Sequence, residues 1–297
     1  MKNYYKYVFA ILAVGIISCE PELENSIEEE NFYSNGEADF STYVAVGNSL
    51  TAGYADGALY RTGQENSFAN ILAQKFAVVQ ETNDFNIPFV ADNAGGLLLG
   101  GNQILPNRFV LNVTANGPRP ARYTGMQPTT EVSNKLTGSF NNFGIPGAKS
   151  FHLLAQGYGS VQGVATGSAN PYFARFSSSS DATVVGDAVA QDPTFFTLWI
   201  GNNDVLSYAT SGGVGEFQLG NTDVSSYGEN DITDPNAFAF VYSQIVESLT
   251  ANGAEGVLVN IPSVTAAPFF TTVPNNALVI DAATAANLTG FFRAVAG

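Results

Sequence analysis

Three strand-like segments in this chain each end at a turn that contains glycine. They cover residues 43–46, 140–143 and 194–200, and the last is apolar enough to be buried on both faces of a sheet. Strands that alternate with helices favour a parallel sheet with helices on both sides. Because the carboxyl ends of parallel strands share one edge, the three turns are three candidates for one site.

The first turn carries a serine in a position suited to chemistry. Gly47-Asn48-Ser49-Leu50 follows an apolar, β-branched run, and small residues continue after it. A serine between a strand and a helix has its hydroxyl at the sheet edge, next to helix N-terminal N–H groups that can hold an anion. The same pattern also fits a serine that only caps the helix.

The three turns together resemble a known family. Gly47-Asn48-Ser49-Leu50, Asn142-x-Gly-x-x-Gly147 and Gly201-x-Asn203-Asp204 resemble the first three sequence blocks of the GDSL or SGNH hydrolases, in the same order. The resemblance covers residues 41–265, with Asn48 where the family has aspartate. It implies a three-layer α/β/α, flavodoxin-like sandwich with a mostly parallel sheet and, here, long loop insertions.

The resemblance also implies roles for three residues. Ser49 would be the nucleophile, and its backbone N–H, the Gly147 N–H and the Asn203 side-chain amide would form the oxyanion hole. One such donor is typically worth about 10²–10³ in rate. This acyl transfer needs no metal or organic cofactor. As purely structural residues, Gly147 would be a helix-start glycine and Asn203 a turn asparagine.

The family's last block, Asp-x-x-His, has no counterpart in the sequence. The single histidine, His152, lies shortly after Gly147 and would act as the base only in a rearranged site. We therefore expect residues 41–297 to form an incomplete hydrolase domain, truncated at the C-terminus before that block. On this interpretation the chain itself is inactive or nearly so.

The N-terminus has the layout of a lipoprotein signal. Lys2 and Lys6 precede an apolar run over residues 8–17, which is too short to span a bilayer and ends at Ser18-Cys19. Residues 16–19 resemble the bacterial lipobox, so we expect a signal peptide over 1–18 and lipidation at Cys19. The acidic residues 19–40 then predict a flexible tether. An ordinary signal peptide with an incidental cysteine is the alternative.

Composition excludes several classes of protein. The formal net charge of −15 argues against nucleic acid as a partner. One cysteine precludes an internal disulfide, and one histidine excludes a histidine-rich metal site. No glycine-rich phosphate fingerprint followed by an acidic residue supports a nucleotide-binding module. Composition does not indicate an oligomeric state.

Hydrophobic periodicity predicts the other elements. Helices are expected over 68–76, after Gly147 as far as residue 158, from Pro235 to about Gly253, and over 281–295. Residues 86–91 weakly resemble a strand, and residues 256–261 resemble a buried one. Residues 92–139 predict loops or small hairpins, which at this length suggest a functional insertion.

These observations lead to one functional hypothesis and one alternative. The hypothesis is a lipid-anchored serine ester hydrolase of the outer membrane, on either face, which acts on acyl or carbohydrate O-acyl esters. The alternative is a non-catalytic lipoprotein that binds glycan or lipid on a degenerate scaffold of the same fold.

Overall fold

The computed structural model describes residues 33–272 and 279–296 of the chain. The expected signal peptide, Cys19 and most of the expected tether therefore lie outside the described residues.

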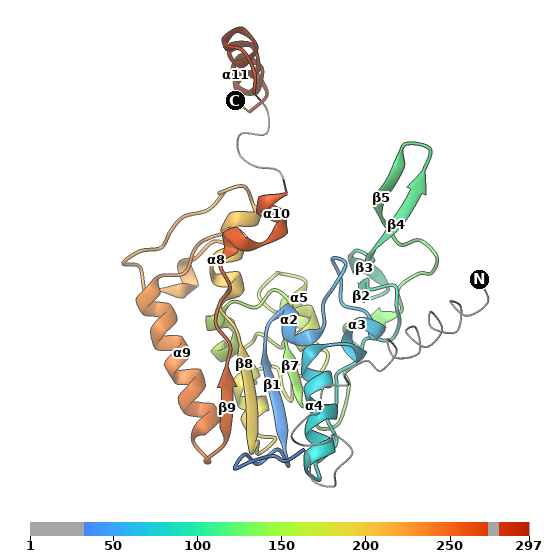
Figure 1. Ribbon diagram of the computed structural model, residues 1–297, viewed down its shortest axis with the longest axis vertical. Helices are drawn as coiled ribbons and strands as arrows, with labels where there is room; N and C mark the ends of the chain where they lie inside the picture. The colour runs from blue at the N-terminus through green and yellow to red at the C-terminus, as the bar shows by residue number, and fades with distance from the viewer. Residues whose placement is uncertain (1–32, 273–278, 297) are drawn as a thin grey trace, which may run out of the picture.

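A four-stranded parallel sheet forms the centre of the molecule (Figure 1). Its strands lie in the spatial order β7-β1-β8-β9, and every pairing is parallel. Their bounds are Tyr43–Gly47 for β1, Asn142–Gly144 for β7, Phe195–Trp199 for β8 and Glu255–Leu258 for β9. The chain is thus mixed α/β, and the doubly buried strand predicted over 194–200 is confirmed by β8.

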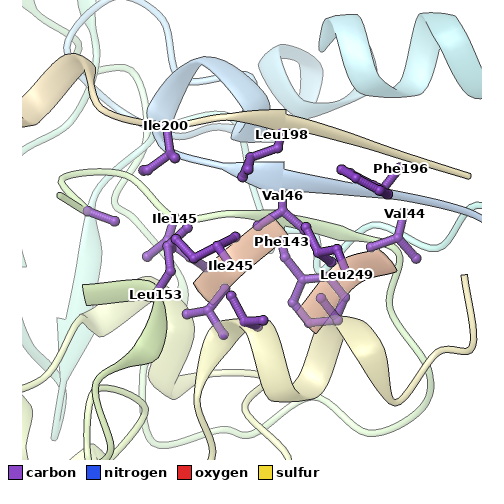
Figure 2. Packing of buried hydrophobic residues seen from close by; sticks show 14 of the residues in the cluster. Val44, Val46, Phe143, Ile145, Leu153, Phe196, Leu198, Ile200, Ile245 and Leu249 are labelled. Carbon is purple, nitrogen blue, oxygen red and sulfur yellow. The ribbon is translucent and has the colours of Figure 1, made fainter. Parts of the chain in front are cut away.

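One face of the sheet packs against helices α7 (Val184–Val189) and α9 (Pro235–Thr250). Side chains of a strand alternate between its two faces, so every second residue of β1 and β8 points into this layer. Figure 2 shows α9 directing its apolar side chains at the strands. The cluster includes Val44, Val46, Phe143, Phe196, Leu198, Ile245 and Leu249.

The opposite face of the sheet is covered by α4 (Phe68–Val79), whose N-cap Ser67 accepts a hydrogen bond from the Asn70 N–H. The Phe76 ring of α4 stacks on Phe40 at 4.0 Å between centroids. Phe40 also donates its backbone N–H to the Gln80 side chain. The packed part of the chain therefore starts before residue 41, within the segment expected to be a tether.

The connections between strands define a reversal in the sheet. In chain order the strands are β1, β7, β8 and β9, so the spatial order is 2-1-3-4. The chain moves from β1 outward to β7, then crosses back to β8 on the other side of β1. In open α/β sheets, ligands bind at the carboxyl ends of the strands where the order reverses. In this molecule that point lies between β1 and β8.

The segment from Asp92 to Ser139 forms hairpins, as predicted. β2 and β3 pair antiparallel, β6 joins β2, and β4 and β5 form a separate two-stranded arm (Figure 1). The strand bounds are β2 Leu97–Leu99, β3 Asn102–Leu105, β4 Phe109–Thr114, β5 Gly117–Arg122 and β6 Thr130–Glu131. The remaining helices are α2 Ser49–Ala52, α3 Arg61–Glu65, α5 Val161–Val164, α6 Pro171–Ala174, α8 Asn202–Thr210, α10 Pro268–Thr271 and α11 Ala282–Ala296.

The strand weakly predicted over 86–91 is wrong, because side chains take the place of a partner strand. Gln64 accepts from the Val90 N–H at 2.7 Å, and Thr130 accepts from the Ala91 N–H at 3.0 Å. The Arg175 guanidinium donates to the Phe89 carbonyl at 2.5 Å. With its backbone groups satisfied in this way, the segment runs extended without joining a sheet.

Two further predictions need correction. The helix expected after Gly147 is a 3₁₀ turn, Ser150–Leu154, and the chain leaves it before Gly157, whose φ of 80° is left-handed. The strand expected to be buried over 256–261 is β9, which pairs with β8, lies at the edge of the sheet formed by the described strands and is exposed along its length. By contrast, α9 begins as predicted, with Pro235 at its first position and Asp234 as its N-cap.

No helix within 33–272 or 279–296 is long and apolar enough to cross a membrane. The helix predicted over 281–295 is confirmed by α11, and its Phe291, Phe292 and Val295 side chains are exposed.

Candidate functional site

The three turns singled out in the sequence lie at the carboxyl ends of three adjacent strands. Gly47, the last residue of β1, pairs with Gly144 of β7 on one side and with Trp199 of β8 on the other. The strands therefore end level with one another, and the turns that carry Ser49, Gly147 and Asn203 leave the same edge of the sheet. The structure thus brings together the elements that carry all three predicted site residues.

Ser49 is the first residue of α2, and its neighbour Asn48 caps that helix. Asn48 is fully buried, and its side-chain oxygen accepts from the Leu50 N–H at 3.0 Å. The interpretation of Ser49 as the helix cap is therefore wrong. Among the described residues, no hydrogen bond involves the half-buried Ser49 hydroxyl or the Ser49 N–H. Both groups remain available to a ligand.

Asn48 also ties the serine turn to the next strand. Its amide nitrogen donates to the side-chain oxygen of Asn202, at the start of α8, over 3.1 Å. An aspartate at position 48 would have no hydrogen to donate in this contact. The asparagine thus connects the turn after β1 directly to the turn after β8.

Glycine at positions 47 and 144 lets the turns pack closely. A Cβ on Gly47 would lie 2.5 Å from the Trp199 carbonyl oxygen, and one on Gly144 would lie 2.2 Å from the Ala52 nitrogen. Both contacts are with backbone atoms, which cannot move aside. Gly144 allows α2 to sit directly on the end of β7, and Gly47 allows the end of β1 to approach both α2 and the end of β8.

Gly147, unlike Gly47 and Gly144, is not required for close packing, because its α-carbon faces open space. Its φ is 83°, and a Cβ built there would meet no atom within 4 Å. The residue is exposed, and its N–H makes no hydrogen bond within the described part of the chain. Gly147 therefore offers an accessible backbone donor next to the sheet edge.

Asn203 lies in the first turn of α8, which begins after Gly201 at a φ of 107°. Its side-chain nitrogen donates one hydrogen to the Ala148 carbonyl at 2.8 Å. This bond joins the Asn203 side chain to the segment that follows Gly147. An amide NH₂ has two hydrogens, so one remains for a ligand.

Ser49 borders a cavity of about 390 Å³. Its polar lining comes from the serine and asparagines of the two turns and from Ser263. The other walls are apolar side chains of α2 and α8 and the loop after β9. The lining residues are Asn48, Ser49, Leu50, Asn202, Asn203, Leu206, Ile261, Pro262, Ser263, Val264, Ala266 and Ala267. None of them is an aspartate, glutamate or histidine.

A second cavity, of about 730 Å³, lies next to Gly147 and also borders Asn203. It is bordered by Gly147, Lys149, His152 and Glu229, together with aromatic side chains such as Tyr227. Asn203 lines both cavities. The titratable groups near the site therefore lie on the Gly147 side rather than on the Ser49 side.

His152 does not have the properties of a general base for Ser49. Its Nδ1 atom accepts from the Lys149 backbone N–H at 3.0 Å, so that lone pair is already used. The ring stacks on Tyr158 at 4.7 Å, and burial, aided by the nearby Lys149 charge, lowers its pKa to about 4. A neutral imidazole with Nδ1 as acceptor carries its proton on Nε2, where it is a donor.

Sequence reasoning assigned no role to Asp204, which holds two of the turns together. Its buried carboxylate accepts from the Ser150 N–H at 2.8 Å, the Ser150 hydroxyl at 2.7 Å and the Thr233 hydroxyl at 2.9 Å. Burial raises the pKa of this carboxyl above its ordinary value. Its position directly after Asn203 was the only sequence signal for this role.

No group of three or more His, Cys, Asp or Glu side chains among the described residues is placed to hold a metal ion. Comparison of the chain with protein-family models, curated proteins and solved structures gave no match. The case for a function therefore depends on the geometry of the three turns.

Proposed function

We propose that this chain carries the serine and oxyanion-hole half of an ester hydrolase of the GDSL or SGNH type. The single observation that carries the proposal is the edge shared by β1, β7 and β8, from which Ser49, Gly147 and Asn203 all leave. The strand order 2-1-3-4 supports it, because flavodoxin-like sheets begin in this order and bind ligands at the reversal.

The available groups suit acyl transfer. The Ser49 oxygen attacks the ester carbonyl carbon, and the new oxyanion is held by the unused N–H groups of Ser49, Gly147 and Asn203. The bond from carbon to the alcohol oxygen then breaks, and the serine proton ends on the leaving alkoxide. In the second half of the reaction, water attacks the carbonyl carbon of the acylated Ser49. The bond to the Ser49 oxygen then breaks, the oxygen regains a proton, and the free acid is released. Each donor contributes about 10²–10³ in rate when aimed at the oxyanion.

The described residues that border the Ser49 cavity include no side chain that could take the serine proton. Among residues 33–272 and 279–296, no acidic residue or histidine lines its cavity, and the His152 Nδ1 lone pair already accepts from the Lys149 N–H. General-base catalysis is typically worth about 10²–10⁴ in rate. We therefore expect Ser49 to react with strongly activated reagents, while turnover of ordinary esters is slow.

A fluorophosphonate reagent tests the proposal, because it bonds covalently to a nucleophilic serine and its phosphoryl oxygen occupies the oxyanion hole. We expect mass spectrometry of the labelled chain to place the adduct on Ser49. Ser49→Ala should abolish the label. Ser263→Ala, which removes another serine from the same cavity, should leave labelling unchanged. An unlabelled chain, or a label that survives Ser49→Ala, would contradict the proposal.

The second candidate is a non-catalytic lipoprotein that binds glycan or lipid on the same scaffold. It is favoured because the part of the chain that the structure describes places no acid or histidine in the lining of the Ser49 cavity. It predicts ligand binding without any covalent adduct at Ser49, so the labelling experiment distinguishes the two candidates.

The proposed setting is the bacterial outer membrane, with a signal peptide over 1–18, a lipid anchor at Cys19 and an acidic tether after it. Expression in a bacterium with labelled palmitate tests this part. The label should enter the wild-type chain and not Cys19→Ala. Equal incorporation in both would contradict the anchor.

A further inference from the structure

The geometry points to the 390 Å³ cavity beside Ser49 as an acyl-chain chamber, which selects esters of medium-length aliphatic acids over acetyl esters. This inference rests on the proposed function, because it names the substrate class for the same serine. Its grounds are the chemistry of the walls, the size of the space and the position of Ser49 on its border.

The walls of the chamber divide into a polar end and an apolar body. The polar end is formed by Ser49 and the asparagines at the starts of α2 and α8, next to the proposed oxyanion hole. The body is formed by Leu50, Leu206 and Ile261 and the small residues of the loop after β9. An acyl group bonded to Ser49 would have its carbonyl at the polar end and its tail among the apolar side chains.

The size of the chamber excludes a good fit for a short acyl group. At ~30 Å³ for a water-sized unit, 390 Å³ corresponds to about 13 such units. A methylene group is similar in size to a water molecule. The ester carbonyl group and its oxygens would take about three of these units at the polar end, which leaves room for about ten carbons. An acetyl group would therefore leave most of the apolar wall in contact with water, whereas a chain of about eight to ten carbons would cover it. Each methylene that is buried strengthens binding roughly fourfold when burial is complete.

The second cavity does not offer the same environment. It is bordered by Lys149, His152 and Glu229 and by serine hydroxyls, and Ser49 is not among its lining residues. Apolar side chains such as Phe151, Leu154 and Phe240 also line it, so an aliphatic tail placed there would lie beside charged and apolar groups together. The described lining residues of the Ser49 cavity include no charged side chain, and charged groups remain better solvated by water than by a tail. The apolar tail is therefore assigned to the chamber on the Ser49 side.

A series of alkyl fluorophosphonates with methyl, butyl, octyl and hexadecyl chains tests the chamber. Octyl adds seven methylenes to methyl, and at about half of full burial each contributes roughly twofold. We therefore expect the labelling rate of Ser49 to rise about 100-fold from methyl to octyl and to rise no further at hexadecyl. Leu206→Trp fills the chamber and should remove most of the preference for octyl. Leu219→Trp, at an exposed position outside the chamber, is the matched control and should keep it. A flat chain-length profile would overturn the inference.

Decanoate binding separates this inference from the proposed function. Calorimetric titration of decanoate into the Ser49→Ala chain needs no nucleophile, and binding should weaken at least tenfold in Ser49→Ala/Leu206→Trp. Decanoate binding of this kind without any Ser49 adduct would support the chamber and contradict the hydrolase. A Ser49 adduct without chain-length preference or decanoate binding would support the hydrolase and overturn the chamber. If the chain forms no Ser49 adduct and does not bind decanoate, both the hydrolase proposal and the chamber are overturned.

Discussion

The two cavities that meet at Asn203 differ in the chemistry that each contains. The cavity on the Ser49 side has a hydroxyl without a hydrogen-bond partner in the described structure, and none of its described lining residues is an aspartate, glutamate, histidine, lysine or arginine. The cavity on the Gly147 side has His152, Lys149 and Glu229, but its histidine is held as a neutral donor. The comparison shows that residue types alone do not identify a catalytic pair, because each lone pair and proton must also be uncommitted.

Substitution of Asn203, which lines both cavities, should have the largest effect on the reaction at Ser49. Asn203→Ala removes the proposed side-chain oxyanion donor, and we expect the rate of fluorophosphonate labelling at Ser49 to fall by about 10²–10³. Asn252→Ala, at an exposed position, should not change the rate. Thermal unfolding of each variant would show whether the fold is intact. A folded Asn203→Ala chain that labels at the wild-type rate would exclude Asn203 from the site.

Substitution of Asp204 tests how much its hydrogen bonds to Ser150 and Thr233 stabilise the turns around the two cavities. Asp204→Ala leaves the Ser150 N–H and two hydroxyls without their acceptor, so we expect a loss of about 3 kcal/mol in the free energy of unfolding. Urea denaturation measures this loss. Asp223→Ala removes a carboxylate that, among the described residues, accepts from the exposed Ser225 alone, so it should cost less than about 1 kcal/mol. Equal losses in the two variants would show that Asp204 does not brace the turns.

Substitution of His152 tests whether this histidine takes part in the reaction at Ser49. Its pKa is about 4 when folded against an ordinary 6.5, so the folded state favours the neutral ring. The stability from this preference is present above pH 6.5 and is lost as the pH falls toward 4. Between pH 7 and pH 5 the loss is about 2 kcal/mol.

His152→Gln should reduce that pH dependence of stability, measured by urea denaturation at both pH values, and leave Ser49 labelling within about twofold. A large fall in labelling with unchanged stability would instead place His152 in the reaction.

Of these substitutions, Gly147→Ala should have the smallest effect on stability and on labelling at Ser49. Alanine at a φ of 83° costs about 1 kcal/mol of backbone strain, yet its methyl group would meet no neighbouring atom. Gly147→Ala should therefore lower the free energy of unfolding by about 1 kcal/mol and slow labelling less than tenfold. A loss as large as that of Asn203→Ala would mean that the backbone must move freely at this position.

The sheet was predictable because burial on both faces leaves a clear signal in the sequence. The run at 194–200 is typical of a strand buried on both faces, and the structure confirms it as β8. The turns at Ser49, Gly147 and Asn203 were predictable for the same reason, because each one follows such a strand. Their positions relative to one another then followed from the parallel pairing.

Other features depend on contacts between residues far apart in the sequence. Residues 86–91 have strand-like composition, but Gln64 and Thr130 satisfy their backbone, and no local pattern shows this. The chamber beside Ser49 requires the loop after β9 to lie over α2 and α8. Likewise, only the position of the Lys149 N–H shows that the His152 lone pair is occupied.

The amide contact between Asn48 and Asn202 has a consequence for the conditions under which the site keeps its shape. Neither side chain carries a charge at any ordinary pH, and the contact is buried. Salt screens charged pairs but has little effect on a neutral hydrogen bond in the interior. The link between the serine turn and its neighbouring strand is therefore indifferent to ionic strength and acidity, in a chain whose net charge of −15 makes other contacts sensitive to both.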